Sequence, residues 1–291
     1  MKVLCFGSLN IDYVYQVDHN VSSGETENSS DMSINCGGKG LNQSIALARA
    51  GASVWHAGMV GEEGAELIEK CAENGVNIDY ICTVEGRSGH TIIQVDKNGN
   101  NSIILFGGAN RCMTEKYIDE VLGGFSEGDI ILLQNEINLL SVIIDKAYEK
   151  EMKIILNPSP YDNSLKECDL GKVSLFLLNE IEGEQMTGEK EPQRIIEEIR
   201  KKYPDSETVL TLGEDGAIYS DKMKVYKQEA FKVKAVDTTA AGDTFTGFFV
   251  ASLLEGKKTE ECLKLAAKAS SIAVTRHGAL DSIPRMEEVE I

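Results

Sequence analysis

The residues best suited to catalysis lie near the C-terminal end, in Asp237-Thr-Thr-Ala-Ala-Gly-Asp243, which is followed by an apolar segment with helical spacing. The small residues at 240–242 leave the first N–H groups of that helix uncovered, and such an N-terminus attracts anions. Asp243 places a carboxylate at the rim of this anion site. The local pattern alone leaves two interpretations open, an ordinary N-terminal helix residue or a general base beside a phosphate.

A second stretch, Cys36-Gly-Gly-Lys-Gly-Leu-Asn42, has three glycines within four residues, which permits close approach of the backbone to a ligand. Asn42, one turn into the following helix, offers a donor and an acceptor to a sugar. The stretch fits neither the GxxxxGK[ST] pattern nor the GxGxxG dinucleotide pattern. We therefore expect neither a Walker-type site nor a NAD-dependent enzyme.

The elements that must position these residues alternate between strand and helix. The apolar strand 2–6 ends in Gly7 to Asp12, where Asn10 and Asp12 are candidates to bind a polyol. From residue 112 the alternation is regular and predicts a parallel sheet covered on both faces. We expect strands at 130–134, 153–157, 174–178, 208–212 and 232–236, and the polar residues that follow the first four to line one sheet edge.

Two segments differ in character from this core. Residues 13–36 alternate and then become polar, and residues 89–107 contain two apolar runs joined at Asn98-Gly99, a hairpin signal. We assign them to a small β-sheet lid. The core is then expected to comprise 1–12, 37–88 and 108–291.

Composition excludes several classes of protein. A formal net charge of −18 over 291 residues disfavours a nucleic-acid-binding surface. Neither a membrane-spanning apolar run nor a signal-peptide pattern is present, so we expect a cytoplasmic protein without membrane contact. Seven scattered cysteines without a CxxC pair disfavour structural zinc and a disulfide framework. An anionic substrate must then be bound by backbone N–H groups and bound cations.

Together, Gly37-Gly-Lys-Gly-Leu-Asn-Gln43 and Asp237-Thr-Thr-Ala-Ala-Gly-Asp243 resemble the two signatures of the PfkB carbohydrate kinases. The resemblance extends along essentially the whole chain, and Ala-Ala-Gly-Asp is similar to the ribokinase branch. It implies a three-layer α/β/α fold with a mostly parallel central sheet and a small β-sheet lid. It further implies ATP and a sugar as substrates, Mg²⁺ and K⁺ as cofactors, and a homodimer formed through the lid.

The resemblance also implies residue roles. Asp243 would be the base, and Ala241, Gly242 and Asp243 would form the anion hole. The implied sugar contacts are Asn10, Asp12, Gly38, Lys39, Gly40, Asn42, Glu136 and Asp243. The implied nucleotide contacts are Asn179, Thr211, Leu212, Gly213, Glu214, Asp215, Gly216 and Gly242. Mg²⁺ would be supported by Asn179 and Glu182, and K⁺ by Asp237, Thr239, Ala273, Arg276, Gly278 and Ser282.

Several substrates stay open. D-ribose, phosphorylated on its terminal hydroxyl to ribose 5-phosphate, is the leading prediction. Another pentose, a ketohexose such as fructose, or a nucleoside is the alternative, since Leu41 stands where ribokinases usually carry Ala. A catalytically inactive sugar-binding regulator is a more remote alternative, because such a protein would be expected to have lost Asp243 or Gly242.

Overall fold

The computed structural model describes residues 1–289 and is built on a nine-stranded sheet, in the order β13-β12-β11-β10-β9-β8-β1-β4-β5. The strands from β11 to β5 run parallel, and β12 and β13 are antiparallel. Their bounds are β1 Val3–Phe6, β4 Val54–Val60, β5 Asn77–Thr83, β8 Ile130–Gln134, β9 Lys153–Asn157, β10 Leu175–Asn179, β11 Glu207–Thr211, β12 Ala217–Ser220 and β13 Val225–Gln228.

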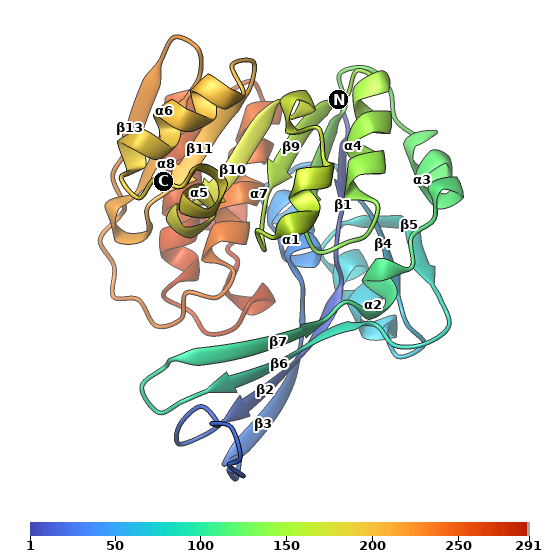
Figure 1. Ribbon diagram of the computed structural model, residues 1–291, viewed down its shortest axis with the longest axis vertical. Coiled ribbons are helices and arrows are strands. Elements are labelled where there is room, and N and C mark those ends of the chain that lie inside the picture. Colours follow the sequence, from blue (N-terminus) through green and yellow to red (C-terminus); the bar gives the residue numbers. More distant parts are fainter. Residues whose placement is uncertain (290–291) are drawn as a thin grey trace.

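Helices cover both faces of this sheet, which confirms the predicted three layers (Figure 1). In β1, Val3 and Cys5 pack on one side while Leu4 and Phe6 pack on the other, and all four are fully buried. The first face carries α1 Lys39–Arg49, α2 Ala65–Glu73, α7 Ala241–Leu254 and α8 Thr259–Ala273. The second carries α3 Glu115–Leu122, α4 Leu140–Glu149, α5 Glu180–Thr187 and α6 Pro192–Lys202; α9 is Met286–Val289.

A separate four-stranded sheet, ordered β3-β2-β6-β7, projects from the large domain (Figure 1). Its strands are β2 Asn10–Gln16, β3 Asp31–Gly37, β6 Gly89–Val95 and β7 Asn101–Phe106. Because β2 begins at Asn10, both Asn10 and Asp12 lie on this small sheet. The register sets Asp12 beside Asn35 and Thr91, so these three side chains share one face. Within residues 1–289, no helix has the length and apolar character that crossing a membrane requires.

The predicted strand at 232–236 is wrong. The last strand of the large sheet is β13, and residues 229–240 are irregular. The N–H groups of Val236 and Asp237 both donate to the carbonyl of Val274, just past the end of α8, and not to a neighbouring strand. Alternation of Lys with Val therefore reflects an exposed connection, since Lys232, Val233 and the residues up to Val236 are all exposed.

Helices α1 and α7 approach each other unusually closely. A Cβ atom added at Gly247 would lie 2.4 Å from Ala46 Cβ and 2.7 Å from Leu47 N, so only glycine fits at this position. The contact matters because α1 carries Asn42 and Gln43, whereas the first turn of α7 carries Asp243.

We predict that Gly247→Ala lowers the free energy of unfolding by about 1–3 kcal/mol, because the added methyl overpacks the α1–α7 contact. Alanine is the better helix former, so any loss measures the clash. We also expect kcat to fall as the two helices separate. Urea denaturation and steady-state kinetics measure both effects. Gly171→Ala is the control, since its Cβ would meet only the Asp169 side chain at 3.2 Å; equal stability of the two variants would contradict the prediction.

Candidate active site

The site is centred on the N-terminus of α7. The residue before the helix, Ala240, has a φ of 58°, and no side chain among residues 1–289 caps the helix. Ala241 N donates to the carbonyl of Thr238 at 3.2 Å, whereas the N–H groups of Gly242 and Asp243 have no partner in the described part of the chain. A Cβ at Gly242 would meet nothing within 4 Å. Gly242 and Asp243 both line the cavity described below, so an anion there can accept from their N–H groups.

Two side-chain amides of α1 hold the Asp243 carboxylate. Asn42 Nδ2 donates to Oδ2 at 2.9 Å, and Gln43 Nε2 donates to Oδ1 at 2.8 Å. Burial raises the pKa of Asp243, while Lys39 and the two amides act in the opposite direction. The outcome is a carboxylate with a fixed plane and a raised proton affinity, both of which suit a general base.

On the side of the small sheet, Asn10 and Asp12 lie close to the Gly-rich turn. Asn110 Nδ2 donates to Asn10 Oδ1 at 2.7 Å, which leaves the Asn10 amide donors available to a ligand. Thr91 Oγ1 donates to Asp12 Oδ1 at 2.6 Å. Burial outweighs this bond and raises the pKa of Asp12 to about 6. The Gly-rich turn itself bends through Gly38, whose φ is 97°.

The predicted sugar contacts Lys39 and Glu136 pair with each other. Lys39 Nζ lies 3.2 Å from Glu136 Oε1, and Lys39 N donates to Oε2 at 3.1 Å. Ser8 Oγ also donates to Oε2, and accepts from Gly40 N at 3.2 Å. Burial disfavours the Lys39 ammonium, but Glu136 and Asp243 outweigh it and raise the pKa of Lys39. The amine therefore stays charged beside Asp243.

A cavity of about 240 Å³ opens in front of α7 along the carboxyl ends of β9, β10 and β11. Asn179 and Glu182, which both line it, form a capping box at the start of α5, with Glu182 Oε2 and Asn179 Oδ1 each accepting a backbone N–H. The predicted residues in its wall are Lys39, Asn179, Glu182, Thr211, Ala241, Gly242 and Asp243, and the others are Asn157, Ser159, Leu177, Leu178, Thr238, Ala240 and Thr246.

The remaining predicted nucleotide residues form the turn between β11 and β12. Leu212 is buried in the core, whereas Glu214 and Asp215 are exposed. Leu212 N donates to Gly216 O at 2.8 Å and closes the turn. A Cβ at Gly216 would lie 2.0 Å from Gln228 O, and its φ of 94° also favours glycine. Of the predicted segment 211–216, Thr211 alone lines the cavity.

The predicted K⁺ residues lie where the loop before α7 meets the loop after α8. Asp237 Oδ1 accepts from Thr239 N at 2.9 Å and from Thr239 Oγ1 at 2.6 Å, while Oδ2 accepts from Gly278 N at 2.9 Å. These bonds outweigh burial and lower the pKa of Asp237. The Ser282 hydroxyl is buried and donates to Ala279 O, and the Arg276 side chain pairs with Glu288; the Ala273 carbonyl accepts from Arg276 N.

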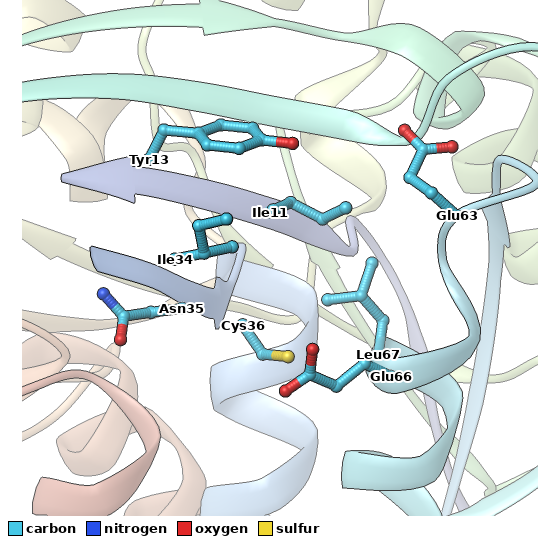
Figure 2. A pocket seen from close by; sticks show the side chains of 8 residues that line it. All are labelled: Ile11, Tyr13, Ile34, Asn35, Cys36, Glu63, Glu66 and Leu67. Atoms are coloured by element: carbon cyan, nitrogen blue, oxygen red, sulfur yellow. The ribbon is translucent and has the colours of Figure 1, made fainter. Parts of the chain in front are cut away.

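Figure 2 shows a second cavity, of about 210 Å³, where the small sheet meets the start of α2. Its walls are Ile11, Tyr13, Ile34, Asn35 and Cys36 from the sheet and Glu63, Glu66 and Leu67 from the α2 side. It contains none of the predicted site residues. By the strand register, Ile11 and Tyr13 face away from the side of the sheet that carries Asn10 and Asp12.

Sequence reasoning missed several residues that hold the predicted ones. Gln43 stood within the Gly-rich motif but was given no role, and Asn157 and Gln134 stood at strand ends named only as polar. Thr91 and Asn110 gave no signal, because their partners Asp12 and Asn10 are 79 and 100 residues away. Leu41 lies in the apolar core with no exposed surface, so it does not form an open wall of the sugar site.

Residues 1–286 match the family model described as pfkB family carbohydrate kinase. The chain belongs to this family. It is therefore an ATP-dependent carbohydrate kinase, as the two motifs indicated. A ribokinase of Haemophilus influenzae is 36% identical to it, over 97% of this chain and 95% of that protein.

Solved structures of two kinases resemble the fold closely. The structure of a Thermotoga maritima ribokinase matches this PfkB kinase with a TM-score of 0.90 and 34% identity, covering 99% of this chain and 98% of that one. An Arabidopsis thaliana ribokinase complexed with ribose and ATP matches with a TM-score of 0.86 and 29% identity, over 99% and 97% of the two chains. The predicted ribokinase-like fold is confirmed.

We predict that the KM of this kinase for its carbohydrate rises as the pH falls through about 6, because protonation removes an acceptor from Asp12. At pH 5 about one-tenth of Asp12 stays ionised, so KM should be about tenfold higher than at pH 7. Initial rates at saturating Mg²⁺-ATP measure this. In Asp12→Asn the KM should be high and independent of pH. A wild-type KM that is constant between pH 5 and 7 would contradict the prediction.

Proposed function

We propose that this PfkB kinase transfers the γ-phosphoryl group of ATP to the terminal hydroxyl of D-ribose, giving ribose 5-phosphate and ADP. The proposal rests on the position of the Asp243 carboxylate. It lies at the open N-terminus of α7, between the 240 Å³ cavity and the polar residues near the small sheet. Ribose is proposed because near full-length relatives named ribokinase are similar to this chain.

In this proposal Asp243 removes the proton from the ribose hydroxyl. The hydroxyl oxygen bonds to the γ-phosphorus of ATP, and the bond between that phosphorus and the bridging β-phosphate oxygen breaks, which releases ADP. Phosphoryl transfer passes through a loose transition state, so positioning and charge stabilisation supply most of the catalysis. The N–H groups of Gly242 and Asp243, which have no partner within residues 1–289, would donate to the phosphoryl oxygens in the cavity that these residues line. Ala241 contributes by its small side chain, since its own N–H is engaged with Thr238.

The sugar would bind between the small sheet and α1. Asn42 Oδ1 is enclosed and has no partner within residues 1–289, so a sugar hydroxyl that donates to it would satisfy a buried acceptor. Asn10 and Asp12 supply donors and an acceptor from the small sheet. The other proposed contacts are Gly38, Lys39, Gly40 and Glu136, of which Lys39 and Glu136 also fix each other.

The oxygen-bearing residues at the cavity and at the adjoining loops are suited to bind cations. Asn179 and Glu182 both line the cavity and carry side-chain oxygen atoms, so they would hold Mg²⁺ through water. The ion would supply charge that neutralises the triphosphate. The turn from Thr211 to Gly216 would contact the nucleotide. The ionised Asp237 favours a cation at the adjoining loops, and we propose K⁺ there, with Thr239, Ala273, Arg276, Gly278 and Ser282 as the other residues of the site.

The alternatives have less support. A different sugar or a nucleoside was considered because Leu41 stands where ribokinases usually carry Ala. Leu41 is packed in the core, so it gives no support to these alternatives. An inactive sugar-binding regulator would not require the arrangement of Asp243 beside open helix N–H groups. A cytoplasmic location also stays a prediction; the seven cysteines, all of which are free, are compatible with a reducing compartment.

The proposal predicts selective turnover of ribose when ADP release is measured with ribose, 2-deoxyribose, fructose, adenosine and fructose 6-phosphate. Chelation of Mg²⁺ should abolish turnover, and replacement of K⁺ by a bulky monovalent cation should lower kcat. Preference for another acceptor would retain the kinase chemistry and reject ribose. No turnover of any acceptor would favour the regulator, and calorimetry of sugar binding would then be the next experiment.

We also propose that the chain forms a homodimer through the small sheet. This sheet exposes large apolar side chains that monomers seldom present to water, with exposed fractions between 39% and 62%: Met32, Ile34, Ile92, Ile104 and Phe106 on the face that carries Tyr13, and Ile103 and Leu105 on the face that carries Asp12. A second copy of the same sheet would cover such a surface symmetrically.

Light scattering should give a mass twice the 31.8 kDa of the chain. Ile103 and Ile104 are neighbours in β7 that point to opposite faces and are 54% and 62% exposed. The double variant Ile103→Asp/Ile104→Asp should be monomeric, and the two single variants identify the face that is covered. Met223→Asp, at an exposed turn of the large domain, is the control. A wild-type chain with the mass of a monomer would reject the proposal.

A further inference from the structure

A chain of buried amides runs through the core to Asp243. Gln43 and Gln134 have no exposed surface, and their side chains meet where α1 crosses the carboxyl end of β8. Gln134 Nε2 donates to Gln43 Oε1 at 2.7 Å, and Gln43 Nε2 donates onward to Asp243 Oδ1 at 2.8 Å. Burying a side-chain amide costs free energy of folding unless the amide is hydrogen-bonded, so the presence of two such amides in the core calls for a role.

The neighbours of Gln43 permit one orientation of its amide. Its nitrogen end faces two acceptors, Asp243 Oδ1 and Asn157 Oδ1, the second at 3.1 Å. Asn157 is itself oriented, because its Nδ2 donates to the carbonyl of Leu177 at 2.9 Å. The oxygen end of Gln43 faces the donor of Gln134. A flipped amide would set oxygen against two oxygens and nitrogen against nitrogen, which loses three hydrogen bonds at once.

The chain continues beyond Gln134 to the Gly-rich turn. Gln134 Nε2 also donates to Cys5 Sγ at 3.6 Å, and the Cys5 thiol donates to the carbonyl of Gly40 at 3.4 Å. The donors thus run in two directions from Gln134, through Gln43 to Asp243 and through Cys5 to the Gly40 carbonyl. The relay links β1, β8, β9 and α1 to the first turn of α7.

We propose that Gln43, oriented by Gln134 and Asn157, is a positioning residue that fixes the plane of the Asp243 carboxylate for proton removal from the sugar hydroxyl. The inference rests on the proposed role of Asp243 as the base. Asn42 and Gln43 bind different carboxylate oxygens, so together they block rotation of the group. Loss of Gln43 leaves Asn42 alone to orient the base, and a small misplacement of a reacting group lowers rates strongly.

The test compares Gln43→Met, Gln134→Met and the double variant in the full-length enzyme with ribose and Mg²⁺-ATP. Methionine keeps the unbranched shape and removes the amide. Gln43→Met should lower kcat about 10–100-fold with the ribose KM within about threefold. The acid limb of the kcat–pH profile should move up by about one pH unit, because a donor to the ionised Asp243 is lost. The test uses the pH profile of kcat, because the titration of Asp12 is expected to change the sugar KM and would also appear in kcat/KM.

Gln134→Met should change kcat and the acid limb in the same direction but less, since Gln43 then keeps its two acceptors, Asn157 and Asp243, and loses only the donor to its oxygen. The double variant should match Gln43→Met, because Gln134 acts through Gln43. If Gln43→Met fails to fold, Gln134→Met, whose side chain does not touch Asp243, still tests the claim. Ile45→Val, a buried truncation in the same helix, is the control; it should lower Tm and leave the pH profile unchanged.

An acid limb that stays in place in both amide variants would overturn the positioning role, as would effects on kcat that multiply in the double variant. The wild-type profile separates this failure from failure of the base assignment. If wild-type kcat shows no acid limb, the role of Asp243 as the base is wrong. If the wild-type limb is present and the amide variants do not move it, the role of Gln43 alone is wrong.

Discussion

The structure depends on the pair of hydrogen bonds that joins α1 to the Asp243 carboxylate. An ionised carboxylate enclosed by protein is unfavourable unless donors are fixed around it. Asn42 and Gln43 supply these donors, and they reach Asp243 because Gly247 lets α7 pack against α1 at Ala46. The same contact leaves the N-terminus of α7 open towards the cavity. One close helix contact thus provides both the base and its anion site.

Much of the fold was predictable because buried parallel strands are continuous apolar runs bounded by polar residues. The strands 130–134 and 153–157 were predicted to the residue. The antiparallel strands β12 and β13 were missed, since each has four residues and β13 is partly exposed. The strand predicted at 232–236 is absent because alternation of Lys and Val occurs in exposed connections as well as in edge strands, so the pattern alone does not distinguish the two.

The motifs predicted which residues gather at the site, but not how they bond to one another. Lys39 and Glu136 were both assigned to the sugar, and the structure shows that they also form an ion pair. Gln43 lay inside a motif, yet its contact with Asp243 spans 200 residues. Helical spacing gives the face on which a side chain lies, whereas the partner across the interface depends on the packing of two helices. For that reason the carboxylate was predictable and its orienting amides were not.

The most direct test of the account is phosphoryl transfer by Asp243→Asn, measured beside calorimetry of ribose binding. Asn keeps the shape of the side chain and cannot accept the proton, so kcat should fall by roughly 10²–10⁴-fold or more. Ribose affinity should stay within about threefold of wild type, because the other proposed sugar contacts remain. A variant with near-normal kcat would contradict the account, since the chemistry would then not need a base at residue 243.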